Sequence, residues 1–566
     1  MALPPKVLVF GDDTRSFLTC VRSLGRQGIE VHAAPYSLDA PALRSRYIHK
    51  VHLLPYYLDG GEKWLQALQA LLLAERYDLL LPCEERSILP LFVHQSELTG
   101  GALLAIPDAV ALDVFFDKLN TRQLAQRCKV TVPDGHVWRD SSSIQQLQSE
   151  IGFPMVVKHR QSYSLPNLYV RTQVRILGDH EALAQWFNDN QPIADSVYFE
   201  KVVNGIGLGV SVLCHEGHVL QAFEHHRTHE LAGSSYYRKS MPLDGERLDA
   251  VDRMVSAIQY TGLAMFEFKL DTCTGKWALL EINARPWGSL PLPVAWGVDF
   301  PYRLYQLLCK HQITPAVQYP TERYNRNLIA DIWQIRSLVT YLKDQPVKLS
   351  VAILRWLAGF SRILILREKH DVLVADDPAP AWMEIKQFVM QRLQKTRWQR
   401  SVLRGDAALT QLINSKPQNL LFICQGNICR SPYAERRARS IFSSFGLNTT
   451  VDSAGMLPRN RRPSPHTAID AAKFTDVDLN SHLSKYADSD LVSKADLIFI
   501  FDNTNLESFK QRYPTQIKKL VFLSVFNNYD NVKNYITDPE GKDIYAFQKT
   551  YDTINICLMN LAQKLK

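Results

Sequence analysis

The chain of 566 residues has few features of secreted or membrane proteins. Its nine cysteines are scattered, without a Cys-x-x-Cys pair or metal-ligand spacing, which favours a reducing cytoplasm over a disulfide framework. Residues 1–13 do not combine a charged region with a long apolar segment, so no signal peptide is predicted. The longest apolar stretch, Val351–Leu366, is interrupted by Arg355 and Arg362. The sequence therefore predicts a cytoplasmic protein without a transmembrane segment.

The chain also has no basic run interleaved with aromatic residues. Its net charge of +8 is modest for this length, which is compatible with an anionic substrate but does not indicate nucleic-acid binding. Apolar residues make up 46% and charged residues 22%, so we expect sizeable hydrophobic cores and no extensive disorder. The length predicts three or four domains.

The most specific motif is LLFICQGNICRSPYAE, Leu420–Glu435. Its first residues form an apolar run typical of a buried strand, and a helical pattern begins at Ser431-Pro432. Cys424 and Arg430 therefore share one tight loop between a strand and a helix, where backbone N–H groups create an anion-binding hole. Such a site stabilises a thiolate, and an arginine offers a planar fork to phosphate oxygens. The motif predicts attack by Cys424 on a phosphate monoester.

This stretch resembles the signature loop of the low-molecular-weight protein tyrosine phosphatases, and the resemblance extends over about Asn419–Lys566. It implies a parallel-sheet α/β domain in which Cys424 is the nucleophile and Arg430 binds phosphate. Asp538, in Thr-Asp-Pro, would be the general acid; from the residues alone it could equally open a turn. Ser453 would brace the loop. The remaining loop residues that would bind phosphate are Gln425, Gly426, Asn427, Ile428, Cys429 and Ser431.

Three residues bear on specificity and redox chemistry. Ile428 matches tyrosine-directed members of the family, whereas arginine-phosphate-directed relatives have threonine there. Glu540 follows Asp538-Pro539 where tyrosine phosphatases commonly have aromatics. Phosphotyrosine is therefore the leading substrate, with small phosphate esters as the alternative. Cys429 is either a partner for a protective disulfide or a small buried residue.

The first third of the chain has no G-x-G-x-x-G after its first predicted strand. Apolar β-runs occur at Lys6–Gly11, Ile29–Ala33 and Tyr77–Pro82, separated by helical patterns. Alternating βαβ units predict a parallel, Rossmann-like sheet. Without the fingerprint, the sequence does not predict a dinucleotide site there.

A hairpin further along places acidic residues together. Leu263–Leu270 and Ala278–Asn283 are two strands joined by a turn, so Glu281 and Asn283 project from one face and Glu267 can face them. Two carboxylates and an amide oxygen suit Mg²⁺, or Mn²⁺. The alternative is a salt bridge from Glu281 to Arg285 or Lys269.

The order of charged residues over about residues 1–310 resembles that of ATP-grasp enzymes, in particular carboxylate–amine ligases and carbamoyl-phosphate-synthase-like members. The segments GLAMFEFKLD and ALLEINARPWGSL are similar to their metal-binding strands. The resemblance implies an α+β domain in which Glu267, Glu281 and Asn283 hold the metal. It assigns residues to ATP binding as follows: Lys118 and Lys158 at phosphates, Glu200 and the backbone at Val202 at adenine, and Arg285 at the transferred phosphoryl.

Two features of this region leave alternatives open. The loop after Lys158 reads HRQSYSLPN, without the glycines usual in the family, so a nucleotide-binding regulatory module with weak turnover is the alternative to a ligase. Arg227 is either an acceptor- or phosphate-binding residue or a surface cation.

The sequence thus predicts a bifunctional, multidomain α/β protein: a Rossmann-like pre-ATP-grasp domain (1–112), an ATP-grasp domain (113–315), a helical linker (316–418) and a phosphatase domain (419–566). The partners would be ATP, an unknown carboxylate and amine, and a phosphotyrosine protein or small phosphate ester. The phosphatase could also act on the ligase's own metabolite. The basic amphipathic stretch Val389–Arg404 is interpreted as a linker helix, with a membrane-surface helix as the alternative.

Overall fold

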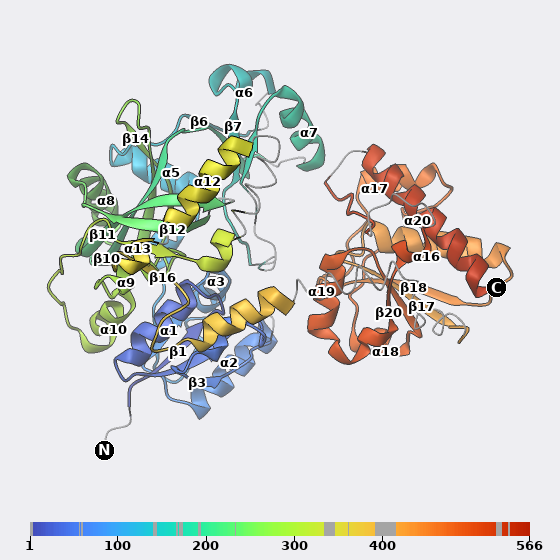
Figure 1. Ribbon diagram of the computed structural model, residues 1–566, viewed down its shortest axis with the longest axis horizontal. Coiled ribbons are helices and arrows are strands. Elements are labelled where there is room, and N and C mark those ends of the chain that lie inside the picture. The colour runs from blue at the N-terminus through green and yellow to red at the C-terminus, as the bar shows by residue number, and fades with distance from the viewer. Residues whose placement is uncertain are drawn as a thin grey trace. The chain divides into compact units, whose positions relative to one another are not determined.

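The computed structural model divides into two units, Met1–Val389 and Met390–Lys566 (Figure 1). The residues that the structure describes are 4–55, 57, 60–139, 144–165, 168, 172, 174–190, 194–231, 234–332, 335, 346–359, 361–390, 415–527, 535–541 and 544–566. Among them, no helix is both long and apolar enough to cross a membrane.

The first unit begins with a five-stranded parallel sheet, which confirms the Rossmann-like expectation. The strand order is β3-β2-β1-β4-β5, and the strands are β1 (Lys6–Phe10), β2 (Glu30–Ala34), β3 (Ile48–Val51), β4 (Leu79–Pro82) and β5 (Leu103–Leu104). Alternate residues of β1 face opposite layers: Val7 and Val9 share a core with α1, while Leu8 and Phe10 share one with α2. The helices of this part are α1 (Ser16–Arg26), η1 (Pro41–Arg44), α2 (Glu62–Ala74) and α3 (Glu85–Val93).

Two antiparallel sheets follow, as expected for an α+β domain. The smaller sheet has the order β6-β9-β7-β8 and packs its core against α6 and α7. Its strands are β6 (Gly135–Val137), β7 (Met155–His159), β8 (Arg175–Leu177) and β9 (Val197–Lys201), and the neighbouring helices are α4 (Ala109–Phe115), α5 (Lys118–Arg127), α6 (Ile144–Glu150) and α7 (His180–Asn190).

The larger sheet has seven strands in the order β14-β13-β10-β11-β12-β15-β16, antiparallel except for the β15–β16 pair. The predicted hairpin is present in it as the β13–β14 pair. One face packs on α8, and the other shares its core with the five-stranded sheet. The strands are β10 (Ile206–His215), β11 (His218–Leu231), β12 (Ser234–Met241), β13 (Gly262–Leu270), β14 (Trp277–Asn283), β15 (Tyr324–Arg326) and β16 (Glu368–His370); the helices are α8 (Gly245–Ala257), α9 (Pro291–Ala295), α10 (Phe300–Lys310), α12 (Pro346–Gly359) and α13 (Ser361–Leu364).

The structure corrects the interpretation of 316–418 as a helical linker in its first part. β15 and β16 complete the seven-stranded sheet, and a helix at residues 379–390 lies against the N-terminal part, with Glu384 bonded to Thr14 and Gln387 to the backbone of Asp39. The chain up to Val389 therefore belongs to the first unit. Most of Val389–Arg404 lies outside the described residues, so its interpretation stays a prediction.

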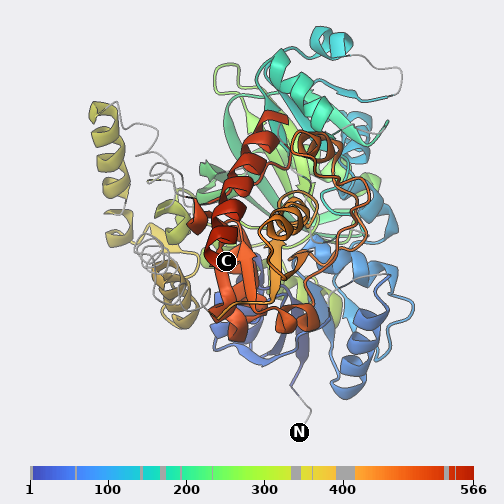
Figure 2. The same ribbon diagram turned by 90° about the vertical axis from the view of Figure 1, so that its right-hand side faces the viewer.

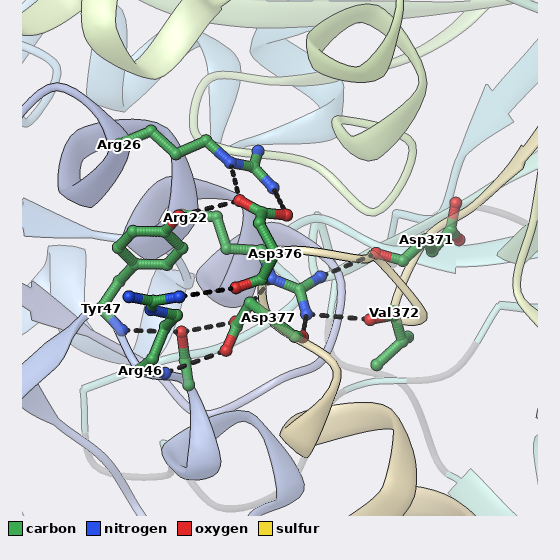
Figure 3. Close-up of polar contacts among 9 residues, drawn as sticks. Arg22, Arg26, Arg46, Tyr47, Asp371, Val372, Asp376 and Asp377 are labelled. Atoms are coloured by element: carbon green, nitrogen blue, oxygen red, sulfur yellow. Dashed lines mark hydrogen bonds and ion pairs between the residues drawn. The ribbon is translucent and has the colours of Figure 1, made fainter.

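A buried ion pair links the segment around Asp377 to α1 (Figure 3). Arg22 donates from Nε to Asp377 Oδ2 at 2.9 Å, and its other nitrogens reach the carbonyl oxygens of Asp371, Val372 and Asp377. Asp377 also accepts from Ser45 Oγ at 2.7 Å. The Arg22 and Asp377 side chains are only 4% and 1% exposed, so each charge depends on the other.

We expect Asp377→Asn to destabilise the first unit by about 3–5 kcal/mol, because it leaves Arg22 buried without a counter-charge. The matched control is Asp376→Asn: Asp376 pairs with Arg26 at the surface, where an ion pair contributes at most about 1 kcal/mol. Urea unfolding followed by circular dichroism measures both. Equal, small effects of the two substitutions would contradict the role of the buried pair.

The second unit contains a four-stranded parallel sheet in the order β18-β17-β19-β20, the α/β architecture expected for 419–566. Helices cover both faces: α16, α17 and α20 pack on one core, and α18 and α19 on the other (Figure 2). The elements are β17 (Asn419–Cys424), α16 (Arg430–Ser444), β18 (Thr450–Gly455), α17 (His466–Lys473), α18 (Ser489–Lys494), β19 (Leu497–Ile500), α19 (Asn503–Arg512), η2 (Pro514–Lys519), β20 (Leu520–Phe522), η3 (Leu523–Phe526) and α20 (Ile544–Leu565).

Candidate active sites

The Cys-to-Arg loop lies where the motif predicts it. β17 ends at Cys424, and α16 begins at Arg430. Asn427 takes a positive φ of 52°, a left-handed conformation that lets successive N–H groups turn toward the inside of the loop. The loop and the N-terminus of α16 therefore form one concave, partly positive surface.

Cys424 is 3% exposed and accepts two hydrogen bonds at sulfur. They come from Asn427 N at 3.2 Å and from Ser431 Oγ at 3.0 Å. Asn427 Nδ2 in turn donates to Ser431 Oγ (3.0 Å) and to Ser453 Oγ (2.9 Å). The structure thus places the Ser431 and Ser453 hydroxyls at the loop, where Asn427 joins them to the contacts around the sulfur.

Arg430 is held at the mouth of this loop by carboxylates from two later segments. Nη1 contacts Asp502 Oδ2 at 2.5 Å and the Ile536 carbonyl at 2.9 Å, and Nη2 pairs with Asp538. Arg430 is 1% exposed, and its Nε has no hydrogen-bond partner among the described residues. One donor of the fork is therefore available for an anion.

The Asp502 and Asp538 carboxylates differ in exposure and in the length of their second hydrogen bond. Asp502 caps α19 by accepting from Asn505 N at 2.9 Å with its other oxygen. Asp538 is 36% exposed, and its other oxygen accepts a 3.3 Å bond from Glu540 N. Asp538 is thus the carboxyl more available for proton transfer to a bound ester.

The rim of the loop contains the remaining predicted residues. Ile428 and Cys429 are buried, and burial raises the pKa of the Cys429 thiol well above its usual range. Burial also raises the pKa of the Glu540 carboxyl, with Asp538 adding to the effect. Gln425 is half-buried and accepts from Ser508 Oγ at 3.3 Å. The Gly426 carbonyl accepts from Arg462 Nη2 at 2.7 Å.

The first unit contains the second set of predicted residues. Lys158, on β7, pairs with Glu200 on β9 and donates to the Leu280 carbonyl of β14 at 3.5 Å. Burial lowers the pKa of Lys158, but Tyr198 and Glu200 outweigh it, so the net direction is upward and the lysine stays charged. The charged Lys158 side chain of the smaller sheet therefore lies next to β14, the strand that contains Glu281.

Lys118 and Val202 lie beside this group. Lys118 opens α5, and its Nζ donates to Ser162 Oγ at 2.9 Å in the loop after β7. Val202 is half-buried and directly follows β9. Both positions are compatible with the predicted nucleotide contacts, which stay predictions.

The predicted metal ligands face one another across β13 and β14. Glu267 is in register with Glu281, and Asn283 Nδ2 donates to Glu267 Oε1 at 3.3 Å. Arg227 Nη1 contacts Glu267 Oε2 at 2.5 Å. Arg285 Nη2 lies 3.0 Å from Asn283 Oδ1 and 3.4 Å from Glu85 Oε1 at the start of α3.

The electrostatics of this group fit a divalent cation. Burial raises the pKa of the Glu267 carboxyl, and Arg227 and Glu281 act on it in opposite directions. Glu267 and Glu281 are half-buried, and two carboxylates side by side in such a site repel each other unless a cation is shared between them. Glu267, Glu281 and the Asn283 amide oxygen are hard oxygen ligands that suit Mg²⁺.

The structure adds one residue that the sequence did not indicate and excludes one of the two interpretations left open for another. Asp502 was missed; its signal was its position directly after the buried run Leu497–Phe501, since neighbouring parallel strands end at one edge. Arg227 is not a surface cation: its side chain is 10% exposed and pairs with Glu230 and Glu267.

Comparisons with solved structures find similarities for both units. One similar structure is N5-carboxyaminoimidazole synthetase from Staphylococcus aureus. The similarity covers 56% of this chain and 81% of that chain, with 15% identity and a TM-score of 0.45. Another is an L-amino acid ligase from Bacillus licheniformis (17% identity, 78% of that chain, TM-score 0.42). These values assign no activity, and the first unit is interpreted from its own residues.

Residues 419–566 match the family described as low molecular weight phosphotyrosine protein phosphatase. A protein-arginine-phosphatase of Bacillus subtilis is 32% identical over 160 residues, which are 26% of this chain and 97% of that protein. The low molecular weight protein-tyrosine-phosphatase Wzb of Escherichia coli is 29% identical over 147 residues, which are 26% of this chain and 95% of the relative. Through its C-terminal unit, the chain belongs to the low molecular weight phosphotyrosine protein phosphatase family.

Proposed function

We propose that the second unit hydrolyses phosphate monoesters through a cysteinyl-phosphate intermediate. The observation that supports this most directly is the Cys424 sulfur, which accepts two hydrogen bonds inside the loop that Arg430 closes. The sulfur attacks phosphorus, the ester P–O bond breaks, and Asp538 protonates the leaving oxygen. Water then attacks phosphorus, the P–S bond breaks, and Asp538 takes up the proton from that water.

Asp538→Asn tests the acid. We expect it to lower kcat by about 10²–10³-fold for phenyl phosphate, whose leaving group needs a proton, and by less for p-nitrophenyl phosphate. Asp502→Asn is the matched control, because it removes a contact to the same Arg430 but leaves the proposed acid in place. We expect its effect on kcat to be the same for both leaving groups. Steady-state kinetics with both esters decides, and the same leaving-group dependence for both variants would contradict the role of Asp538.

The leading substrate of this unit is phosphotyrosine. The support is the apolar Ile428 in the loop, which can pack against an aromatic leaving group, and the tyrosine-directed names of relatives such as Wzb. The protein-arginine-phosphatase among the relatives makes phosphoarginine the other candidate. Hydrolysis of matched phosphotyrosine and phosphoarginine peptides and of small phosphate esters separates the three; a higher kcat/KM for phosphoarginine would overturn the preference.

For the first unit we propose an ATP- and magnesium-dependent carboxylate–amine ligase. The supporting observation is that Lys158 of β7 lies against the β13–β14 hairpin, which is far from it in sequence and contains the Glu267–Glu281 pair, with Arg285 directly after it. When bound, Mg²⁺ would neutralise charge on the phosphates. Lys158 and Arg285 would add fixed positive charge there, and Glu200 would orient Lys158.

A nucleotide-binding module with weak turnover is the second candidate for this unit, favoured by the glycine-free loop after Lys158. Measuring ATP–Mg²⁺ binding by calorimetry, together with ADP release over a panel of carboxylates and amines, distinguishes the two. Binding without release for every pair would favour the module. If one carboxylate–amine pair causes ADP release, a phosphorylated form of the ligation product should also be tested as a phosphatase substrate. A cytoplasmic location stays a prediction.

A further inference from the structure

Two histidines and a glutamate meet on one face of the five-stranded sheet, and none of them belongs to either proposed active site. His32 lies on β2, His52 directly follows β3, and Glu75 directly follows α2 as its C-cap. One potential ligand atom from each lies within 4.8 Å of the other two. The neighbouring strands and the helix above them therefore converge on one point.

Hydrogen bonding fixes the protonation of His32. Its Nε2 lies 2.9 Å from Glu30 Oε1, and a carboxylate accepts, so Nε2 carries the proton. His32 is completely buried, and a neutral imidazole carries a single N–H. The lone pair is then on Nδ1. A histidine whose far nitrogen donates to a carboxylate is the usual arrangement of a metal-bound imidazole.

Two groups that can donate a hydrogen bond lie near that lone pair. Tyr77 OH lies 2.8 Å from His32 Nδ1, and His52 Nε2 lies 3.2 Å from the same atom. One in-plane lone pair cannot serve both well. If His52 is instead protonated at Nδ1, two nitrogen lone pairs face each other. The two nitrogen atoms are 3.2 Å apart. Two nitrogens bound to one tetrahedral zinc ion at about 2.0–2.1 Å would be about 3.3 Å apart.

The charges around the group act in both directions. Lys50 and Lys6 pair with Glu75 at 2.5 Å each, one lysine on each carboxylate oxygen. Lys6 also lies 3.3 Å from Glu30. The C-terminus of α2 adds partial negative charge that favours a cation. The two lysines oppose a cation, so we expect moderate affinity.

We propose that His32, His52 and Glu75 bind a divalent cation of the zinc class, with water completing the coordination. Two imidazole nitrogens with one carboxylate oxygen is a ligand set that zinc accepts and that Mg²⁺ does not favour. The bound ion would join β2, β3 and the end of α2, and would stabilise this part of the first unit by mass action.

Isothermal titration of the full chain with ZnCl₂ in excess Mg²⁺ tests the site; the Mg²⁺ occupies the oxygen site at Glu267. We expect His52→Ala to bind one equivalent of Zn²⁺ fewer than wild type. His49→Ala, which alters an exposed histidine on the same strand, should bind as wild type. Lys50→Met should bind several-fold more tightly, because it removes a cation that competes for Glu75.

A second substitution covers the case in which His52→Ala does not fold. Glu75→Gln keeps the volume of the side chain and should weaken zinc binding by about tenfold or more. Zn²⁺ should also raise the thermal midpoint of wild type and not that of Glu75→Gln. Equal zinc stoichiometry and affinity in wild type and in each folded ligand variant would overturn the proposal.

Discussion

Cys424→Ser is expected to lower kcat for p-nitrophenyl phosphate by at least about 10³-fold, because the alcohol cannot supply the nucleophile that a thiolate supplies. The fold should persist, since serine can accept the same bonds from Asn427 N and Ser431 Oγ that sulfur accepts. Inorganic phosphate should therefore still bind, and its inhibition constant measured against residual turnover or by calorimetry should change only a few-fold.

Cys273→Ser is the matched control for that experiment. Cys273 is exposed in the hairpin turn of the first unit, so its replacement should leave phosphatase activity unchanged. Full phosphatase activity in Cys424→Ser, with the protein shown to be free of wild type by mass spectrometry, would exclude the cysteinyl-phosphate route.

Glu281→Gln is expected to lower Mg²⁺-dependent ADP release by about 10²-fold or more, because it removes one of the two carboxylates that we propose as metal ligands. The change is isosteric and relieves the like-charge contact with Glu267, so folding should not suffer. Because the acceptor is unknown, the dependence of ATP binding on Mg²⁺ provides a readout independent of turnover. That dependence should weaken in Glu281→Gln.

The control is Glu246→Gln, which alters an exposed carboxylate in the first turn of α8. It should retain both ADP release and the Mg²⁺ dependence of ATP binding. Unchanged turnover and binding in Glu281→Gln would reject the metal role of the β13–β14 pair.

The features of this protein that its sequence predicts are the local ones. The loop from Cys424 to Arg430 is specified within seven consecutive positions, between an apolar strand and a helix start. The pairing of Glu267 with Glu281 follows from the period-2 pattern of one short hairpin. In both cases the chemistry depends on residues whose relative position is fixed by a single turn or loop.

Contacts between distant segments were harder to predict. Asp502 reaches Arg430 only because β17 and β19 are adjacent in the parallel sheet. Asp538 was named through the family resemblance, since an Asp-Pro pair alone also opens turns. Arg227, on β11, reaches Glu267, on β13, because β10 lies between these strands and pairs with both.

The segment after residue 316 shows why a pattern can mislead. β15 and β16 are three residues long, too short for a periodic signal. Asp377 stands in a run of Asp, Pro and Ala that is typical of a boundary, yet it is 1% exposed because Arg22 pairs with it. A buried carboxylate whose partner is 355 residues away cannot be distinguished from a solvated one by local sequence.

We propose that one chain contains two separate active sites, and a crossed assay tests this most directly. Wild type, Cys424→Ser and Glu281→Gln are each assayed for p-nitrophenyl phosphate hydrolysis and for Mg²⁺-dependent ATP binding with ADP release. We predict that Cys424→Ser loses only the first activity and Glu281→Gln only the second. Loss of phosphatase activity in folded Glu281→Gln, or retention of both activities in both variants, would contradict the account.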